Sequence, residues 1–354
     1  MLRGHGGEIF FLAQELGVSP WEIQDHSSNL SPLPPPAGLY PLLSQGLPEI
    51  EFLPEVDSAS LRQALAEKYG LSPEYFLPSS GTTEWIFALP RLKPFRKALI
   101  LGPTYSDYAD ALKLAQVPYE YLLAREEDGF RVSPEQLEAK LKEGVDLVFL
   151  CNPNNPTGVY FPLEALEEVL HCFPQTIFVC DESYLDFHPA GKSALSLRPF
   201  PANLVVLRSF SKIYRVPGLR LGYCVSGSSL REDLWQTYLP WSVNRLAQLA
   251  GPWLLQQEGH VEQVRRFVQE ERARFLPLLQ ELPGVRLLAG EVHFFLLKLD
   301  RPAREVWQAL LEGHRILVRD ASNFVGLDAR FLRLALRRRK ENDRLLQALK
   351  EVLA

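Results

Sequence analysis

The sequence has few of the features that mark membrane, exported or metal-binding proteins. Its 354 residues include only four cysteines, with no C-x-x-C pair and no histidine spacing typical of a zinc site. No apolar run approaches the length of a membrane span, and the first residues lack the continuous apolar stretch of a signal peptide. We therefore expect a cytoplasmic protein without a metal site, whose cysteines behave as small buried apolar residues.

The charge pattern gives no indication of a polyanionic partner. The net charge is -5, charged residues make up 23% of the chain, and no long basic run is present. Neither a nucleic acid nor a membrane surface is therefore predicted as a partner. The chain is 46% apolar and too long for one compact core, so its length predicts more than one domain.

Short apolar runs alternate with amphipathic segments through the middle of the chain, which is typical of an α/β fold. The runs are rich in Val, Ile and Leu without polar alternation, so they suit a sheet that is buried on both faces. We predict a large domain with a mostly parallel central sheet flanked by helices, together with a smaller α+β domain. The expected strands of the central sheet are 97–102, 146–151, 176–181, 203–209 and 220–226.

The composition changes twice along the chain, and each change predicts a domain boundary. The proline cluster "SPLPPP" (31–36) ends an N-terminal arm. Beyond about residue 240, a long helical pattern precedes short strands and a final helix. We predict an arm over 1–35 that contributes to the small domain, a large domain over 36–235 and a small C-terminal domain over 236–354.

Polar and aromatic residues follow the predicted strands. "PTYSDY" follows the first strand, "NPNNPTG" the second, "DESY" ends the third and "FSK" follows the fourth. Ligands of open α/β sheets bind at the carboxyl ends of the strands, so these loops predict one site. "SSGTTEW" (79–85) adds small residues at the start of a helix, where an anion can bind.

Together with Arg220, three of these residues, Asn155, Asp181 and Lys212, resemble in type and order the signature of fold-type I pyridoxal-phosphate-dependent enzymes. The resemblance covers nearly the whole chain and implies pyridoxal 5′-phosphate as the cofactor. It implies that Lys212 forms the Schiff base to the cofactor and that Asp181 pairs with its protonated ring nitrogen. A lysine in a poorly hydrated site crowded with cations is a competent amine near neutral pH.

The same resemblance implies the other cofactor contacts. Tyr105 would stack on the ring and count with Lys212 and Asp181 as catalytic, while Asn155 and Tyr184 would bond the phenolic oxygen. Packing remains an alternative role for the two tyrosines, and turn formation for Asn155. The residues implied to hold the cofactor phosphate are Gly81, Thr82, Thr83, Ser209, Ser211 and Arg220.

Three segments outside the cofactor motifs indicate which reaction the protein catalyses. "GHGGEI" (4–9), "LPWSVNRLAQLAG" (239–251) and "RILVRDASNFVGLDARFLRLALR" (315–337) resemble the threonine-phosphate decarboxylases of cobalamin biosynthesis. That resemblance implies a homodimer that decarboxylates L-threonine O-3-phosphate to (R)-1-aminopropan-2-ol O-2-phosphate. The implied substrate contacts are His5, Asn29, Asn155, Arg319 and Arg333.

Some positions depart from the family pattern near the substrate end. Leu53 stands where a tyrosine of the partner subunit often reaches the cofactor phosphate, and Glu8, His26 and His293 replace other usual residues. L-Serine O-phosphate is therefore an alternative substrate, since one methyl group changes binding by only about 1–3 kcal/mol. A histidinol-phosphate-type aminotransferase is the alternative reaction, and a domain that binds ligand without turnover is a third interpretation.

Overall fold

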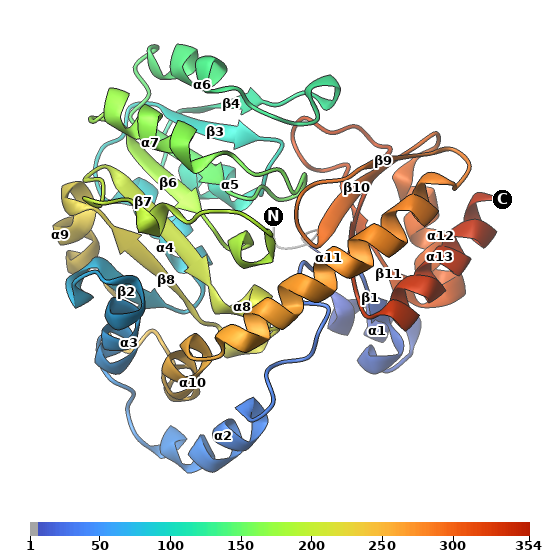
Figure 1. Cartoon of the computed structure of the whole chain (residues 1–354), viewed down its shortest axis with the longest axis horizontal. Coiled ribbons are helices and arrows are strands. Elements are labelled where there is room, and N and C mark those ends of the chain that lie inside the picture. The colour runs from blue at the N-terminus through green and yellow to red at the C-terminus, as the bar shows by residue number, and fades with distance from the viewer. Residues whose placement is uncertain (1–5) are drawn as a thin grey trace.

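A seven-stranded sheet forms the larger layer of the computed structural model, which describes residues 6–354. Its order is β2-β8-β7-β6-β5-β3-β4, on the left of Figure 1. Strands β3 to β7 are parallel, whereas β8 is antiparallel to both of its neighbours. The bounds are β2 (Phe76–Ser79), β3 (Ala98–Gly102), β4 (Tyr119–Leu123), β5 (Leu147–Cys151), β6 (Ile177–Asp181), β7 (Leu204–Ser209) and β8 (Gly222–Ser226).

The mostly parallel sheet and its five predicted strands are confirmed. Every residue of β3, β5, β6 and β8 is buried, as expected for apolar runs covered on both faces. The helices of this layer are α3 (Ala59–Tyr69), α4 (Thr82–Ala88), α5 (Asp107–Leu114), α6 (Pro134–Leu141), α7 (Leu163–Cys172), α8 (Phe210–Ile213), α9 (Ser228–Gln236) and α10 (Arg245–Leu255). Helices α6 and α7 pack together on the near face of the sheet in Figure 1, and α4 packs with α5 behind it.

A smaller antiparallel sheet of order β12-β13-β10-β9 forms the second layer, on the right of Figure 1. Its strands are β9 (Val285–Leu288), β10 (Phe294–Leu299), β12 (Arg319–Asp320) and β13 (Phe331–Ala335). Three helices accompany it: α11 (Glu258–Gln280), α12 (Ala303–His314) and α13 (Arg339–Leu353). The register places Arg333 opposite Arg319, so two cationic side chains come from neighbouring strands.

The N-terminal segment packs against this smaller layer. Strand β1 (Gln24–Asp25) pairs in parallel with β11 (Ile316–Leu317), and α1 (Ile9–Leu16) buries Ala13 against Leu311. Helix α2 (Leu39–Gly46) lies apart from it at the lower edge of Figure 1. The domain limits proposed from the sequence stay a prediction. Within residues 6–354 no helix is long and apolar enough to cross a membrane.

Eight large apolar side chains are exposed on α2, on the segment after it and on the loop after α9. The main-chain N–H of Trp241 bonds the carbonyl of Val56 at 3.0 Å, which joins the loop after α9 to the segment after α2. Leu53 is 76% exposed and Trp241 50% exposed. We call this set the apolar face: Tyr40, Leu47, Ile50, Phe52, Leu53, Val56, Leu239 and Trp241.

Candidate active site

A cavity of about 190 Å³ lies at the carboxyl ends of β5, β6 and β7. The chain runs from β3 outward to β4 and then returns to β5 on the other side of β3, so the loops after β3 and β5 meet there. Most residues predicted from the sequence line this cavity, namely Asn29, Thr82, Thr83, Tyr105, Asn155, Asp181, Tyr184, Lys212 and Arg333.

The other residues predicted for the cofactor phosphate lie beside the cavity lining. Gly81 precedes α4 with φ of 83°, and a Cβ atom there would lie 2.6 Å from the Arg220 guanidinium. Glycine is therefore required where this loop meets Arg220. Ser209 accepts a hydrogen bond from the N–H of Ser211 at 3.2 Å, and it lines a separate cavity of about 240 Å³.

Lys212 follows β7 on the short helix α8. Enclosure in the site, and then the cationic Arg333 and Arg220, lower its pKa to about 8, while Asp181 opposes this change. Its Nζ lies 6.0 Å from the ring centroid of Tyr184. Lys212 therefore has the lowered pKa that an amine nucleophile needs near neutral pH.

Asp181 is held at both carboxylate oxygens. Its Oδ1 accepts hydrogen bonds from the Ser183 hydroxyl at 2.6 Å and the Ser183 N–H at 3.0 Å, and its Oδ2 accepts from the Tyr108 hydroxyl at 2.9 Å. Burial raises the pKa of Asp181, and these donors together with Lys212 oppose the rise. The result is a fixed carboxylate in a low-dielectric site.

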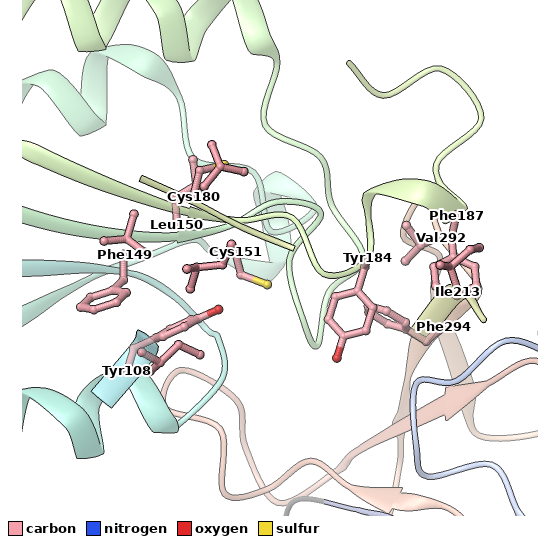
Figure 2. Close-up of a cluster of buried hydrophobic side chains, with 14 of the residues drawn as sticks. Tyr108, Phe149, Leu150, Cys151, Cys180, Tyr184, Phe187, Ile213, Val292 and Phe294 are labelled. Atoms are coloured by element: carbon pink, nitrogen blue, oxygen red, sulfur yellow. The ribbon is translucent and has the colours of Figure 1, made fainter. Parts of the chain in front are cut away.

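Sequence reasoning missed Tyr108 and Ser183. Figure 2 shows the rings of Tyr108 and Phe149 lying against each other beside Cys151 at the end of β5, with centroids 5.1 Å apart. Tyr108 lies in the first turn of α5, whereas Tyr105 precedes the helix, so the spacing of the two tyrosines gave no signal of this contact.

Arg333 enters the cavity from β13 and joins two chain segments. Its guanidinium donates to Asn155 Oδ1 and to the carbonyl of Ser27, and the Asn29 amide also donates to Asn155 Oδ1, at 3.4 Å. Burial lowers the pKa of Arg333 to about 9. Within residues 6–354, Arg333 Nε and Asn29 Oδ1 are buried without a hydrogen-bond partner. Such atoms indicate a place for a polar ligand.

Arg337 holds the segment that carries Asn29 in place through hydrogen bonds to its main chain. Its buried guanidinium donates to the carbonyls of Ser28 at 2.7 Å and Leu30 at 2.9 Å, and it lies 3.7 Å from the Asp25 carboxylate. The Asn29 side chain is thus presented to the cavity by a buried arginine that does not line it.

Arg319, unlike Arg333, does not line the cavity of Lys212. It lines one small cavity with Tyr105 and Asn155, and a second of about 160 Å³ with Gly6 and Glu8. Its guanidinium donates to Asn323 Oδ1 at 2.6 Å, and within residues 6–354 its Nε has no hydrogen-bond partner. Burial lowers the pKa of Arg319 to about 10. His5, the remaining predicted contact, lies outside the described residues.

Two of the unusual residues are buried histidines. His293 packs on Phe187 with centroids 3.7 Å apart, and burial together with Arg337 holds its pKa well below the usual range. Burial, and again Arg337, lower the pKa of His26 to about 4. Both imidazoles are therefore neutral at pH 7, and neither lines the cavity.

The residues around the cavity fit pyridoxal phosphate. A buried carboxylate, Asp181, suits the protonated ring nitrogen, and Lys212 is an amine of lowered pKa. Beside them, Gly81 leaves room only for backbone next to the Arg220 guanidinium, an arrangement suited to a phosphate. These residues would provide partners for the ring nitrogen, the aldehyde and the phosphate of the cofactor.

Comparison with known proteins agrees with the geometry. Residues 47–349 match the model of the family described as aminotransferase class I and II. The chain is 36% identical over 353 residues to the threonine-phosphate decarboxylase of Salmonella typhimurium, covering 99% of this chain and 96% of that protein. It is 33% identical over 355 residues to the histidinol-phosphate aminotransferase of Moorella thermoacetica, covering 99% of this chain and 90% of that protein.

A solved structure is similar over nearly the same length. The L-threonine-O-3-phosphate decarboxylase from Porphyromonas gingivalis superposes with a TM-score of 0.85 at 29% sequence identity. The match covers 94% of this chain and 99% of that one. The arrangement of the two sheets is therefore shared along almost the entire chain.

Proposed function

The chain belongs to the aminotransferase class I and II family and is a pyridoxal-phosphate-dependent enzyme, and from this premise we propose that it decarboxylates L-threonine O-3-phosphate. The product would be (R)-1-aminopropan-2-ol O-2-phosphate, used in the nucleotide loop of cobalamin. Support comes from the relatives of that name, at 36% identity in Salmonella typhimurium and 33% in Caldanaerobacter subterraneus.

The observation that carries the proposal is the pair of arginines on β12 and β13. Arg333 lines the cavity of Lys212, whereas Arg319 lines the cavities next to it. The carboxylate of a phosphoamino acid is attached to the reacting carbon and its phosphate lies farther out. Arg333 would therefore bind the carboxylate and Arg319 the phosphate, each through charge-assisted hydrogen bonds. Asn29 and Asn155, which lie beside Arg333, would also bind the carboxylate end of the substrate. His5 of the N-terminal arm would be a further substrate contact.

The cofactor, when bound, supplies an electron sink for the bond that breaks at the α-carbon. Lys212 would hold the cofactor and afterwards deliver a proton to the α-carbon, which its pKa of about 8 suits. Asp181 would keep the proton on the ring nitrogen, and Tyr105 would cover the ring. Asn155 and Tyr184 would bond the phenolic oxygen.

The cofactor phosphate would be bound by the loop before α4 and by the segment around Lys212. The residues are Gly81, Thr82, Thr83, Ser209, Ser211 and Arg220. Leu53 carries no hydroxyl, so it cannot make the contact that a tyrosine makes there in related enzymes. We propose that the apolar face is the interface of a homodimer, because eight large side chains exposed together on one surface of a monomer are unusual.

Histidinol-phosphate aminotransferase is the second candidate, favoured by the 33% identity to the Moorella thermoacetica enzyme. The two reactions are separated by incubating purified holoenzyme with L-threonine O-3-phosphate alone, and with histidinol phosphate plus 2-oxoglutarate. The proposal expects an amine product from the first mixture and no conversion of the cofactor to its pyridoxamine form. Glutamate formation from histidinol phosphate and 2-oxoglutarate, with no reaction of threonine phosphate, would support the aminotransferase instead. L-Serine O-phosphate in the first mixture tests the alternative substrate, and Lys212→Ala is the inactive control.

A further inference from the structure

Tyr108 joins the cavity to the core of the large sheet. Its ring is 1% exposed, stacks on Phe149 and meets Tyr105 edge-on with centroids 5.8 Å apart. Figure 2 shows its hydroxyl turned toward the side chain of Cys151. The Tyr108 hydroxyl donates to Asp181 Oδ2 at 2.9 Å, while the Cys151 thiol donates to the carbonyl of Pro153 at 3.4 Å.

The hydrogen bonds on Asp181 leave room for one more donor. An ionised carboxylate offers about four acceptor positions. Ser183 fills two of them at Oδ1 and Tyr108 fills one at Oδ2. The position that remains is on the oxygen that Tyr108 holds, and Asp181 lines the cavity. The hydrogen bond from Tyr108 therefore fixes the orientation of that oxygen.

We infer that Tyr108 is a positioning residue for the cofactor, because its hydroxyl holds Asp181 Oδ2 in the orientation in which this carboxylate would receive the protonated ring nitrogen. The inference depends on the cofactor and on Asp181, and it holds for decarboxylation and transamination alike. Failure of the proposed reaction would leave it intact.

The hydrogen bond from Tyr108 also affects the charge of Asp181. Burial favours the neutral acid, and each donated hydrogen bond favours the carboxylate. Tyr108 stays a neutral donor, because burial and the nearby Asp181 raise its own pKa well above the usual value. In Tyr108→Phe the pKa of Asp181 rises further, so the acid takes up its proton at a higher pH. A neutral Asp181 cannot pair with a protonated ring nitrogen.

The test measures cofactor binding rather than turnover. Pyridoxamine 5′-phosphate, which binds without a bond to Lys212, is titrated into the apoenzyme of the full chain and followed by tryptophan fluorescence. For Tyr108→Phe we expect binding about ten-fold weaker than wild type at acidic pH, converging on wild type at alkaline pH where Asp181 is ionised in both. An analogue with carbon in place of the ring nitrogen should bind both proteins equally at every pH.

Tyr223→Phe is the matched control. Tyr223 is also buried and its hydroxyl donates to that of Tyr69 at the same 2.9 Å, but it neither lines the cavity of Asp181 and Lys212 nor contacts Asp181. It should bind pyridoxamine phosphate like the wild type at all pH values. Ser183→Ala, which removes another donor to Asp181, should weaken binding in the same pH-dependent way and carries the test if Tyr108→Phe does not fold. A loss that is constant with pH, or equal for the carbon analogue, would overturn the inference.

Discussion

Replacing Arg319 by glutamine should remove the phosphate contact of the substrate while leaving the reacting carbon in place. Two nitrogens of the Arg319 guanidinium already donate, Nη1 to the carbonyl of Asp320 and Nη2 to Asn323 Oδ1, and within residues 6–354 Nε has no partner. We therefore count one to two new hydrogen bonds to phosphate. At about 1.5–3 kcal/mol for each bond to a charged group, the loss is about 3 kcal/mol.

A loss of that size lowers kcat/KM on the order of 100-fold. The assay compares L-threonine O-3-phosphate with unphosphorylated L-threonine as substrates, because only the first can contact Arg319. Arg319→Gln should lose activity on the phosphate ester and change little on threonine, whereas Arg333→Gln should lose activity on both.

Arg304 provides the matched control for this prediction. It lines the same outer cavity as Arg319 but is exposed, with its guanidinium 3.9 Å from the ring centroid of Trp307. Arg304→Gln should change kcat/KM by less than about two-fold, as expected for an exposed charge. Equal losses on both substrates in Arg319→Gln, or an equal loss in Arg304→Gln, would refute the assignment of the phosphate to Arg319.

Three further predictions follow from the buried charges and the apolar face. The rate of pyridoxal phosphate addition to apoenzyme should rise with pH and level off above about 8, because the neutral amine of Lys212 reacts; stopped-flow absorbance measures it, and a rise continuing to the ordinary lysine range would contradict the lowered pKa. Arg337→Met should destabilise the fold by about 3 kcal/mol in urea unfolding, since it leaves the half-buried Asp25 carboxylate without its cation and the carbonyls of Ser28 and Leu30 without their donor; an unchanged midpoint would contradict this. Trp241→Asp should convert a dimer to a monomer in sedimentation, and an unchanged mass would exclude the apolar face as the interface.

The buried sheet could be predicted because its strands carry their own signal. Five apolar runs without alternation gave five strands, each within a residue or two of its observed bounds. Strand β2 was missed because it is four residues long and contains Pro78, and β4 because its edge position leaves its side chains half-buried. The apolar pattern predicts a strand least well where the strand is short or lies at the edge of the sheet.

The site could be predicted as far as its residues follow strand ends. Asn155, Asp181 and Lys212 were brought together by the parallel order of β5, β6 and β7. Tyr108 was missed because its contact depends on how α5 is rotated against β6, which no spacing reveals. Arg337 was missed because it reads as one of a run of surface cations, "RRRK", although it is buried against residues 25–30.

The most direct test of the proposed reaction follows the carboxyl carbon. Holoenzyme is incubated with L-threonine O-3-phosphate labelled at the carboxyl carbon, with no 2-oxo acid present, and the label in carbon dioxide is compared with the amine product formed. The account predicts release of label in equal amount to (R)-1-aminopropan-2-ol O-2-phosphate, and none with Lys212→Ala. Label retained in a 2-oxo acid, with the cofactor converted to its pyridoxamine form, would contradict it.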